Sequence, residues 1–199
     1  MACLSLRRHI GYRRPMPSPS RIADAVARCC EHEAAIQALN RGEHEDALIL
    51  LAQAVEARPQ DTRIGVDRAK LLLQLGRLDE AETALRALPA AARDDGDIGV
   101  LRAHVGFLLA AEDAPSPEAL AAHFEQAPED SRARHRLAAL LLFRDDYAGA
   151  LDQLLELVHR DREFDEGAGQ RGMLAIFHIL GPDHPLVALY QEALNNALR

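Results

Sequence analysis

Histidine, cysteine and carboxylate side chains are the groups of this chain that could bind a metal or take part in catalysis. The sequence has nine His and three Cys in 199 residues. No two His are spaced as His-Glu-x-x-His or His-x-x-x-His, the patterns that place two metal ligands on one helix face. Cys29 and Cys30 are adjacent, so on a helix their side chains would point about 100° apart. We therefore expect solvated histidines, a pair of small, partly buried cysteines rather than a reactive or metal-binding pair, and no metal site.

A glycine motif near the end of the chain, Gly167-Ala-Gly169-Gln-Arg-Gly172, matches the G-x-G-x-x-G pattern of dinucleotide-binding sites. Such a site needs a buried strand before the motif. Here the motif follows HRDREFDE, which cannot form a buried strand, and precedes two helical segments separated by Gly181-Pro182. We expect a glycine-rich turn that opens a terminal helix pair, with the charge run from Asp161 to Glu166 on a solvated face. The sequence thus predicts no catalytic set, no cofactor and no enzyme.

Small residues recur at a spacing of 34 residues along the first half of the chain. The matching pairs are Ala35 and Ala69, Gly42 and Gly76, Ala47 and Ala81, and Leu51 and Leu85. This is the period of the tetratricopeptide repeat, a unit of two antiparallel helices. The alanines allow close approach of the two helices, and the glycines end the first helix of each pair. The frame returns one residue late in SRARHRLAALLLFRDDYAGALDQLLELVHR, with Ala138 and Ala150 at the close-packing positions and Asp145 in the turn.

The pattern predicts an all-α fold, a tetratricopeptide-like helical-hairpin solenoid with a C-terminal capping helix pair. Ala and Leu dominate the 48% apolar fraction and aromatic residues make up only 4%, which favours helices over strands. We expect one domain at 28–199, with repeats at about 28–61, 62–95, 96–130 and 131–164 and the terminal helix pair at about 168–199. The third repeat is degenerate.

Charge is distributed unevenly. Residues 1–23 contain five of the 23 basic residues and no acidic one, so the rest of the chain carries 18 basic against 31 acidic residues. An acidic body argues against a nucleic-acid partner. The basic leader at 1–27 could be a transit-like peptide, a tail for anionic surfaces, or a disordered leader or linker remnant, which we favour because its length and amphipathicity fit the others poorly. No run approaches the ~18 to 20 apolar residues of a membrane-spanning helix, so we expect a cytoplasmic protein without a membrane partner.

The last third of the chain narrows the expected function. The stretch PEDSRARHRLAALLLFRDDYAGALDQLLELVHRDREF, followed by QRGMLAIFHILGPDHPLVALYQEAL, resembles the C-terminal repeat domain of bacterial thioredoxin-like co-chaperones of the CnoX/YbbN type. The resemblance implies a scaffold that binds a chaperonin or unfolded client proteins. Members of that family carry an N-terminal thioredoxin domain, but only some 27 residues precede the first repeat here, so we expect that domain and its redox chemistry to be absent. A passive assembly or oligomerisation scaffold with one fixed partner is the alternative, and the oligomeric state stays open.

Stacked first helices line the concave face of such a solenoid, and the repeat frame assigns residues to this protein-binding groove. They are His32, Ile36, Arg63, Val66, Asp67, Lys70, Arg132, His135 and Arg136. The competing interpretation is that these side chains are solvated or cover neighbouring helices. A groove that clamps a C-terminal carboxylate needs Lys and Asn at several of these positions, and Ile36 and Asp67 do not fit that mode.

Overall fold

The computed structural model describes residues 31–93, 95–112 and 114–199. Within these ranges the chain forms α-helices joined by short turns and no β-strand, which confirms the predicted all-α solenoid. The basic leader at 1–27 and Cys3, Cys29 and Cys30 lie outside the described residues.

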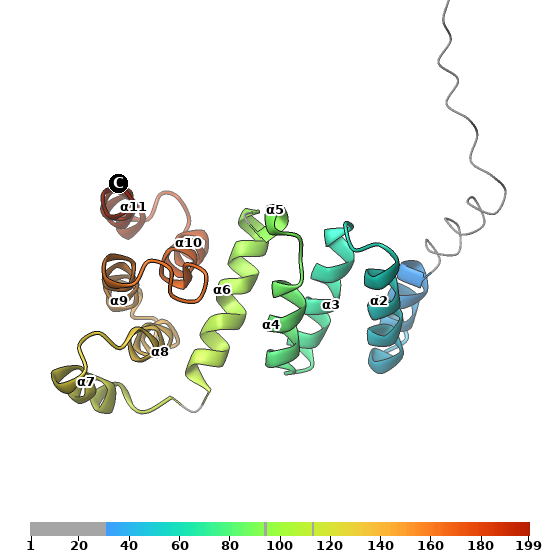
Figure 1. Ribbon diagram of the computed structural model, residues 1–199, viewed down its shortest axis with the longest axis horizontal. Coiled ribbons are helices and arrows are strands. Elements are labelled where there is room, and N and C mark those ends of the chain that lie inside the picture. The colour runs from blue at the N-terminus through green and yellow to red at the C-terminus, as the bar shows by residue number, and fades with distance from the viewer. Residues whose placement is uncertain (1–30, 94, 113) are drawn as a thin grey trace, which may run out of the picture.

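The helices follow one another along an elongated molecule (Figure 1). After helical residues 31–40 come α2 (His44–Ala57), α3 (Thr62–Gln74), α4 (Leu78–Arg86), the short α5 (Ala90–Arg93), α6 (Gly96–Ala111), α7 (Pro117–Gln126), α8 (Ser131–Leu142), α9 (Tyr147–Arg160), α10 (Ala168–Leu180) and α11 (Pro185–Ala197). In Figure 1, α2, α3, α4 and α6 lie side by side, whereas α8 to α11 are seen nearly end-on. The molecule therefore has two halves with differently directed helices, and α6 lies at their boundary.

The turns inside three of the helical hairpins have the left-handed conformation that the repeat frame requires. Gly42 and Gly76 have φ of 77° and 72°, as their predicted helix-ending role demands. In the later hairpin Asp145 takes this place with φ of 60°, and its carboxylate accepts a hydrogen bond from the Tyr147 hydroxyl at 3.1 Å. An aspartate tolerates this conformation better than most residues because its short side chain bonds locally.

The predicted close-packing alanines are buried. Ala35, Ala47, Ala69 and Ala81 in the first half, and Ala138 and Ala150 in the second, are all 0% exposed. Around them α2, α3, α4 and α6 pack in succession, and α8 packs along α9 as a second regular hairpin. The periodic small residues thus mark the helix contacts of both halves.

The helix α6 belongs to two hydrophobic cores. Val105 contributes to the core of the first half, whereas Ala103 and Phe107 contribute to the core of the second. Its sequence, GDIGVLRAHVGFLLAA, has apolar residues around the whole circumference, as expected for a helix buried on more than one side. It packs against α4, α8 and α10.

The third and last helix pairs differ from the simple hairpins expected at 96–130 and 168–199. The main partner of α6 is α10, and α7 packs on α8. Likewise α10 packs mainly on α6 and α9, and α11 packs on α9. Met173 and Ile176 of α10 are 0% exposed and belong to the second core together with Phe107 of α6. The repeat boundaries themselves stay a prediction.

Two glycines permit the approach of α10 to its neighbours. A Cβ at Gly172 would lie 2.9 Å from Phe107 Cζ and 3.0 Å from Leu154 Cδ2, and a Cβ at Gly169 would lie 2.9 Å from Val158 Cγ2. Gly167 precedes α10 in a left-handed conformation with φ of 78°. The G-x-G-x-x-G motif therefore serves a turn, as expected, and helix packing.

We predict that Gly172→Ala destabilises the protein by about 1 to 3 kcal/mol, because Phe107 and Leu154 are fully packed and the added methyl group would separate α10 from α6. Gly99→Ala in α6 is the matched control, since nothing lies within 4 Å of its Cβ position. It should stabilise by roughly 0.5 to 1 kcal/mol through helix propensity. Urea unfolding followed by circular dichroism measures the stability of both variants. Equal stability of the two would contradict the close contact of Gly172 with Phe107 and Leu154.

Candidate protein-binding cleft

A cleft of about 370 Å³ opens where the two halves meet. Its walls come from α4 and α8, its floor comes from α6, and the loop between α9 and α10 closes one side. The floor is formed by Gly106, Leu109 and Ala110, and Phe164 of the loop adds an aromatic ring. The cleft thus combines an apolar floor with walls from both halves.

The two walls carry opposite charges. Arg132 and Arg136, one helical turn apart on α8, form the basic wall, and Asp79 and Glu82 of α4 form the acidic wall. Glu82 binds Arg86 at 3.0 Å. Neither Arg132 nor Arg136 forms an ion pair within the described ranges, so both guanidinium groups can take a ligand. The arrangement can bind a polypeptide segment with apolar and charged side chains.

His135 lies in the wall between the two arginines and is buried, with 8% of its surface exposed. This corrects the expectation of a solvated side chain for His135, whereas His44, His104, His123, His159 and His178 are exposed. Its ring stacks on Phe107 with centroids 5.5 Å apart and meets Phe164 edge-on at 5.9 Å. Burial lowers the pKa of His135 to about 4, and the nearby Arg171 adds to this effect while Asp165 opposes it. At neutral pH the ring is uncharged and acts as an aromatic packing group.

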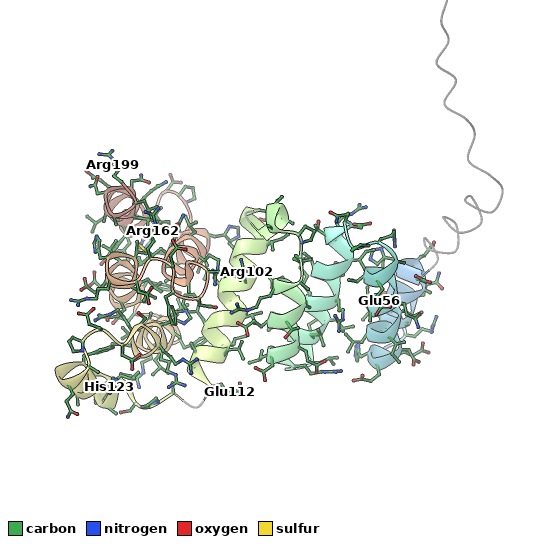
Figure 2. All side chains as sticks on the ribbon, viewed as in Figure 1. Glu56, Arg102, Glu112, His123, Arg162 and Arg199 are labelled. Atoms are coloured by element: carbon green, nitrogen blue, oxygen red, sulfur yellow. The ribbon has the colours of Figure 1, made fainter. Side chains whose placement is uncertain are left out.

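Three arginines from different helices hold the loop beside the cleft. Arg86 of α4 binds Asp165 and lies 3.6 Å from Glu166, and Arg102 of α6 binds Glu166. Arg171 of α10 donates to the backbone carbonyl of Asp165 at 2.8 Å and also to that of Glu166. Figure 2 shows Arg102 on α6 in the middle of the molecule. The cluster therefore joins α4 of the first half to the α9–α10 loop of the second.

The loop at this cluster has an unusual backbone. Asp165, Glu166 and Gly167 are three consecutive left-handed residues, with φ of 45°, 53° and 78°. Such conformations cost of order 1 to 3 kcal/mol for residues other than glycine and persist only where the surroundings hold them. The arginine contacts supply that restraint. Hydrogen bonding to Glu82 and Asp165 raises the pKa of Arg86, whereas burial lowers that of Arg171, with a further contribution from neighbouring Arg102.

The charge run from Asp161 to Glu166 is therefore not the solvated face that was expected. Asp161 accepts a hydrogen bond from the Ser131 hydroxyl at 2.8 Å, and Asp165 and Glu166 bind arginines. The repeat pattern could not reveal this, because the partners lie on α4, α6 and α8, at least 30 residues away in the sequence. The same holds for Asp79, Leu109 and Phe164, which line the cleft and were not among the predicted groove residues. The one sequence signal for the junction between the two halves is that α6 has apolar residues around its whole circumference.

The other six predicted groove residues lie in the first half. His32 and Asp67, on neighbouring first helices, form a hydrogen bond of 3.0 Å. Ile36 is 44% exposed, Arg63 and Lys70 are exposed, and Val66 packs at the edge of the core. The structure thus brings Arg132, His135 and Arg136 into one cleft, and places these six on the first helices outside it.

Comparison with family models identifies the repeats. Residues 38–105 and residues 110–198 each match a tetratricopeptide-repeat model. The chain contains a tetratricopeptide-repeat domain. The first match ends and the second begins within α6, the helix that the two halves share. No curated protein matches the chain.

Among solved structures, the tetratricopeptide-repeat domain is similar to "MamA RS-1 ArsTM double mutant", with 17% identity over 86% of this chain and 94% of that chain and a TM-score of 0.43. It is also similar to "MamA MSR-1 C2", with 15% identity over 86% of this chain and 97% of that chain and a TM-score of 0.40. In the described part of the domain, no helix has the length and apolar character needed to cross a membrane. The same residues contain no group of three or more His, Cys, Asp or Glu side chains placed to hold a metal ion.

We predict that the buried His135 makes the repeat domain lose stability on acidification. The unfolded chain protonates this ring below its ordinary pKa of 6.5, whereas the folded chain resists protonation down to about 4. Stability therefore falls as the pH drops through this window, by about 2 kcal/mol between pH 7 and pH 5. His135→Phe should remove this part of the pH dependence.

Urea unfolding at pH 7 and pH 5 measures the effect. His159→Gln, at an exposed position of α9, is the control and should keep the pH dependence of the wild type. Carboxylates with lowered pKa, such as Asp130 and Glu156, lose their stabilising contacts at lower pH, so the comparison stops at pH 5. A pH dependence in His135→Phe equal to that of the wild type would show that His135 titrates normally.

Proposed function

We propose that the repeat domain binds partner proteins through the cleft between α4 and α8. The observation that carries this proposal is the pair Arg132 and Arg136, which face the cleft from one helix without an acidic partner among the described side chains. Opposite them Asp79 and Glu82 offer negative charge, and Leu109 and Phe164 offer apolar surface. A segment with an acidic side chain near one or two apolar ones fits these groups. Electrostatic complementarity of this kind gives specificity and fast association.

The partner class follows from the resemblance to thioredoxin-like co-chaperones. We propose that the partners are a chaperonin or unfolded client proteins, which expose the apolar and charged segments that the cleft would accept. A scaffold that binds one fixed partner is the second candidate. The two differ in stoichiometry, because a client-binding protein recovers many proteins weakly and a scaffold recovers one partner at a constant ratio.

Charge reversal tests which surface is used. The double variant Arg132→Glu/Arg136→Glu should weaken binding of the purified chain to a chaperonin, or to a reduced and alkylated unfolded protein, by about tenfold or more. Arg63→Glu/Lys70→Glu is the matched control, since it reverses two exposed charges on α3 of the first half. Titration calorimetry at two salt concentrations measures both.

Each outcome is informative. Loss of binding only in Arg132→Glu/Arg136→Glu supports the cleft. Loss only in Arg63→Glu/Lys70→Glu moves the site to the first-half groove with His32, Ile36, Val66 and Asp67. If neither variant loses affinity, the charged walls do not bind the partner. Recovery of one stoichiometric protein from lysate, without chaperones or unfolded proteins, would favour the assembly scaffold.

Binding should not depend on thiols. The sequence contains no Cys-x-x-Cys motif, so we expect no reduction of insulin disulfides by the purified chain. Replacing Cys3, Cys29 and Cys30 together by Ser should leave partner binding within about twofold, well under the ~1.4 kcal/mol that corresponds to a tenfold change. Insulin turbidity and the binding assay measure these two properties, and thiol-dependent capture of clients would contradict the proposal.

A further inference from the structure

A groove follows the contact between α6 and α10. This α6–α10 groove consists of two adjoining hollows of about 540 and 250 Å³, which share Asp97 and Val100 of α6. At 3.6 residues per turn, Asp97 and His104 of the groove lie about 160 to 180° around α6 from Gly106, which lines the floor of the cleft. The groove and the cleft are therefore on opposite sides of α6.

The smaller hollow has mainly apolar walls. Its apolar lining consists of Val100, Leu101, Phe107, Leu142, Ala175 and Ile179. Ile179 is 56% exposed, Leu174 in the larger hollow is 47% exposed, and Phe143, which follows Leu142, is 50% exposed. Single exposed apolar side chains are ordinary on a protein surface, but several along one groove indicate that the groove binds another segment.

The larger hollow adds negative charge. Asp95 and Asp97 line it at the start of α6, are exposed, and form no ion pair within the described ranges. The Asp95 carboxylate accepts a hydrogen bond from the backbone N–H of Asp97 at 3.1 Å. The two arginines of this hollow, Arg102 and Arg171, already bind the loop at 165–166. The groove therefore suits a segment that has both apolar side chains and positive charge.

The chain itself contains such a segment. Residues 4–14 of the basic leader, LSLRRHIGYRR, include four Arg, no acidic residue, and the side chains of Leu4, Leu6, Ile10 and Tyr12. The 16 residues at 15–30 connect this segment to the first described helix, and an extended chain of that length spans roughly 55 Å. Four spacings of about 8 to 10 Å between packed helices, roughly 40 Å, separate residues 31–40 from α6 (Figure 1). The segment is therefore long enough to reach the groove.

We propose that residues 4–14 bind in the α6–α10 groove of the same chain. The apolar side chains of the segment cover Leu174 and Ile179, and its arginines approach Asp97. Burial of apolar surface supplies the stabilisation, and the complementary charge selects the basic segment. The cleft between α4 and α8 stays open for partners, so the leader and the partner occupy opposite sides of α6.

The experiment uses the full chain with Cys29→Ser/Cys30→Ser, so that Cys3, directly before the segment, is the single site for a nitroxide spin label. Paramagnetic broadening of backbone amide signals is then measured by ¹⁵N NMR. The amides of Gly99, Val100 and Ala175 at the groove should broaden more than those of α2. A leader without a docking site would broaden α2, close to its attachment, at least as strongly as the groove. That result would overturn the proposal.

Two groove variants test the contacts. Ile179→Ser and Asp97→Asn should each reduce the broadening at Gly99 by about twofold or more, because each removes apolar contact or charge from the docked state. Ile49→Ser is the matched control for the first, since Ile49 is 55% exposed on α2 and lines neither hollow. Asp183→Asn, at an exposed position before α11, is the control for the second. Equal loss in variant and control would contradict the assigned contacts.

A mixed sample identifies which chain supplies the segment. Spin-labelled chains without ¹⁵N are mixed with ¹⁵N-labelled chains that carry no spin label. The groove amides of the ¹⁵N-labelled chains should stay sharp, because the segment binds within its own chain. Broadening in the mixture would show that the groove takes the leader of a second copy and would overturn the proposal. Raising the salt concentration should reduce the broadening in the singly labelled chain, because salt screens the attraction between arginine and Asp97.

Discussion

The contact of α6 with two cores is the interaction on which the rest of the structure depends. In a regular solenoid each repeat packs only against its neighbours, and the superhelix follows from small rotations between them. Here Val105 points into the first core, and Phe107, two residues later, packs in the second. Two cores that share one helix cannot shift independently, because a side chain displaced in one core moves the backbone of the other. The change in helix direction between the halves in Figure 1 is thus fixed by packing.

The arginine cluster gives the same boundary a second, polar restraint. Isolated surface ion pairs contribute little to stability, but Arg102 and Arg171 are largely buried, with 8% and 15% of their side chains exposed. Removing one partner of a buried pair is strongly destabilising, because it leaves an unpaired charge in the interior. Arg86 reaches from α4 to the loop that closes the cleft, so the separation of the cleft walls depends on these contacts. The left-handed turn at 165–167 is the backbone consequence.

The regular parts of this fold could be predicted from the sequence because their signals are local. The 34-residue spacing of Ala35 and Ala69 reflects a contact between neighbouring helices, and the turn residues Gly42, Gly76 and Asp145 stand where the frame required them. The pairing of α6 with α10 could not be predicted in this way, because the repeat frame assigns each helix to its neighbour. Periodicity also does not show which acidic residues pair with arginines, so the sequence predicts Asp165 and Glu166 on a solvated face. Of the predicted groove residues, three fall in one cleft, and their binding role stays a prediction.

The pairing of α6 with α10 also has a consequence for synthesis of the chain on the ribosome. The apolar side of α6 that faces the second core cannot be covered when α6 emerges, because its main partner is made only after α7, α8 and α9. Until then Phe107 and its neighbours are exposed on a nascent chain in which the residues of the first core have already been made. Non-local contacts of this kind slow folding and leave apolar surface open to aggregation. The interval between α6 and α10 is therefore the stretch of translation in which this chain most needs protection.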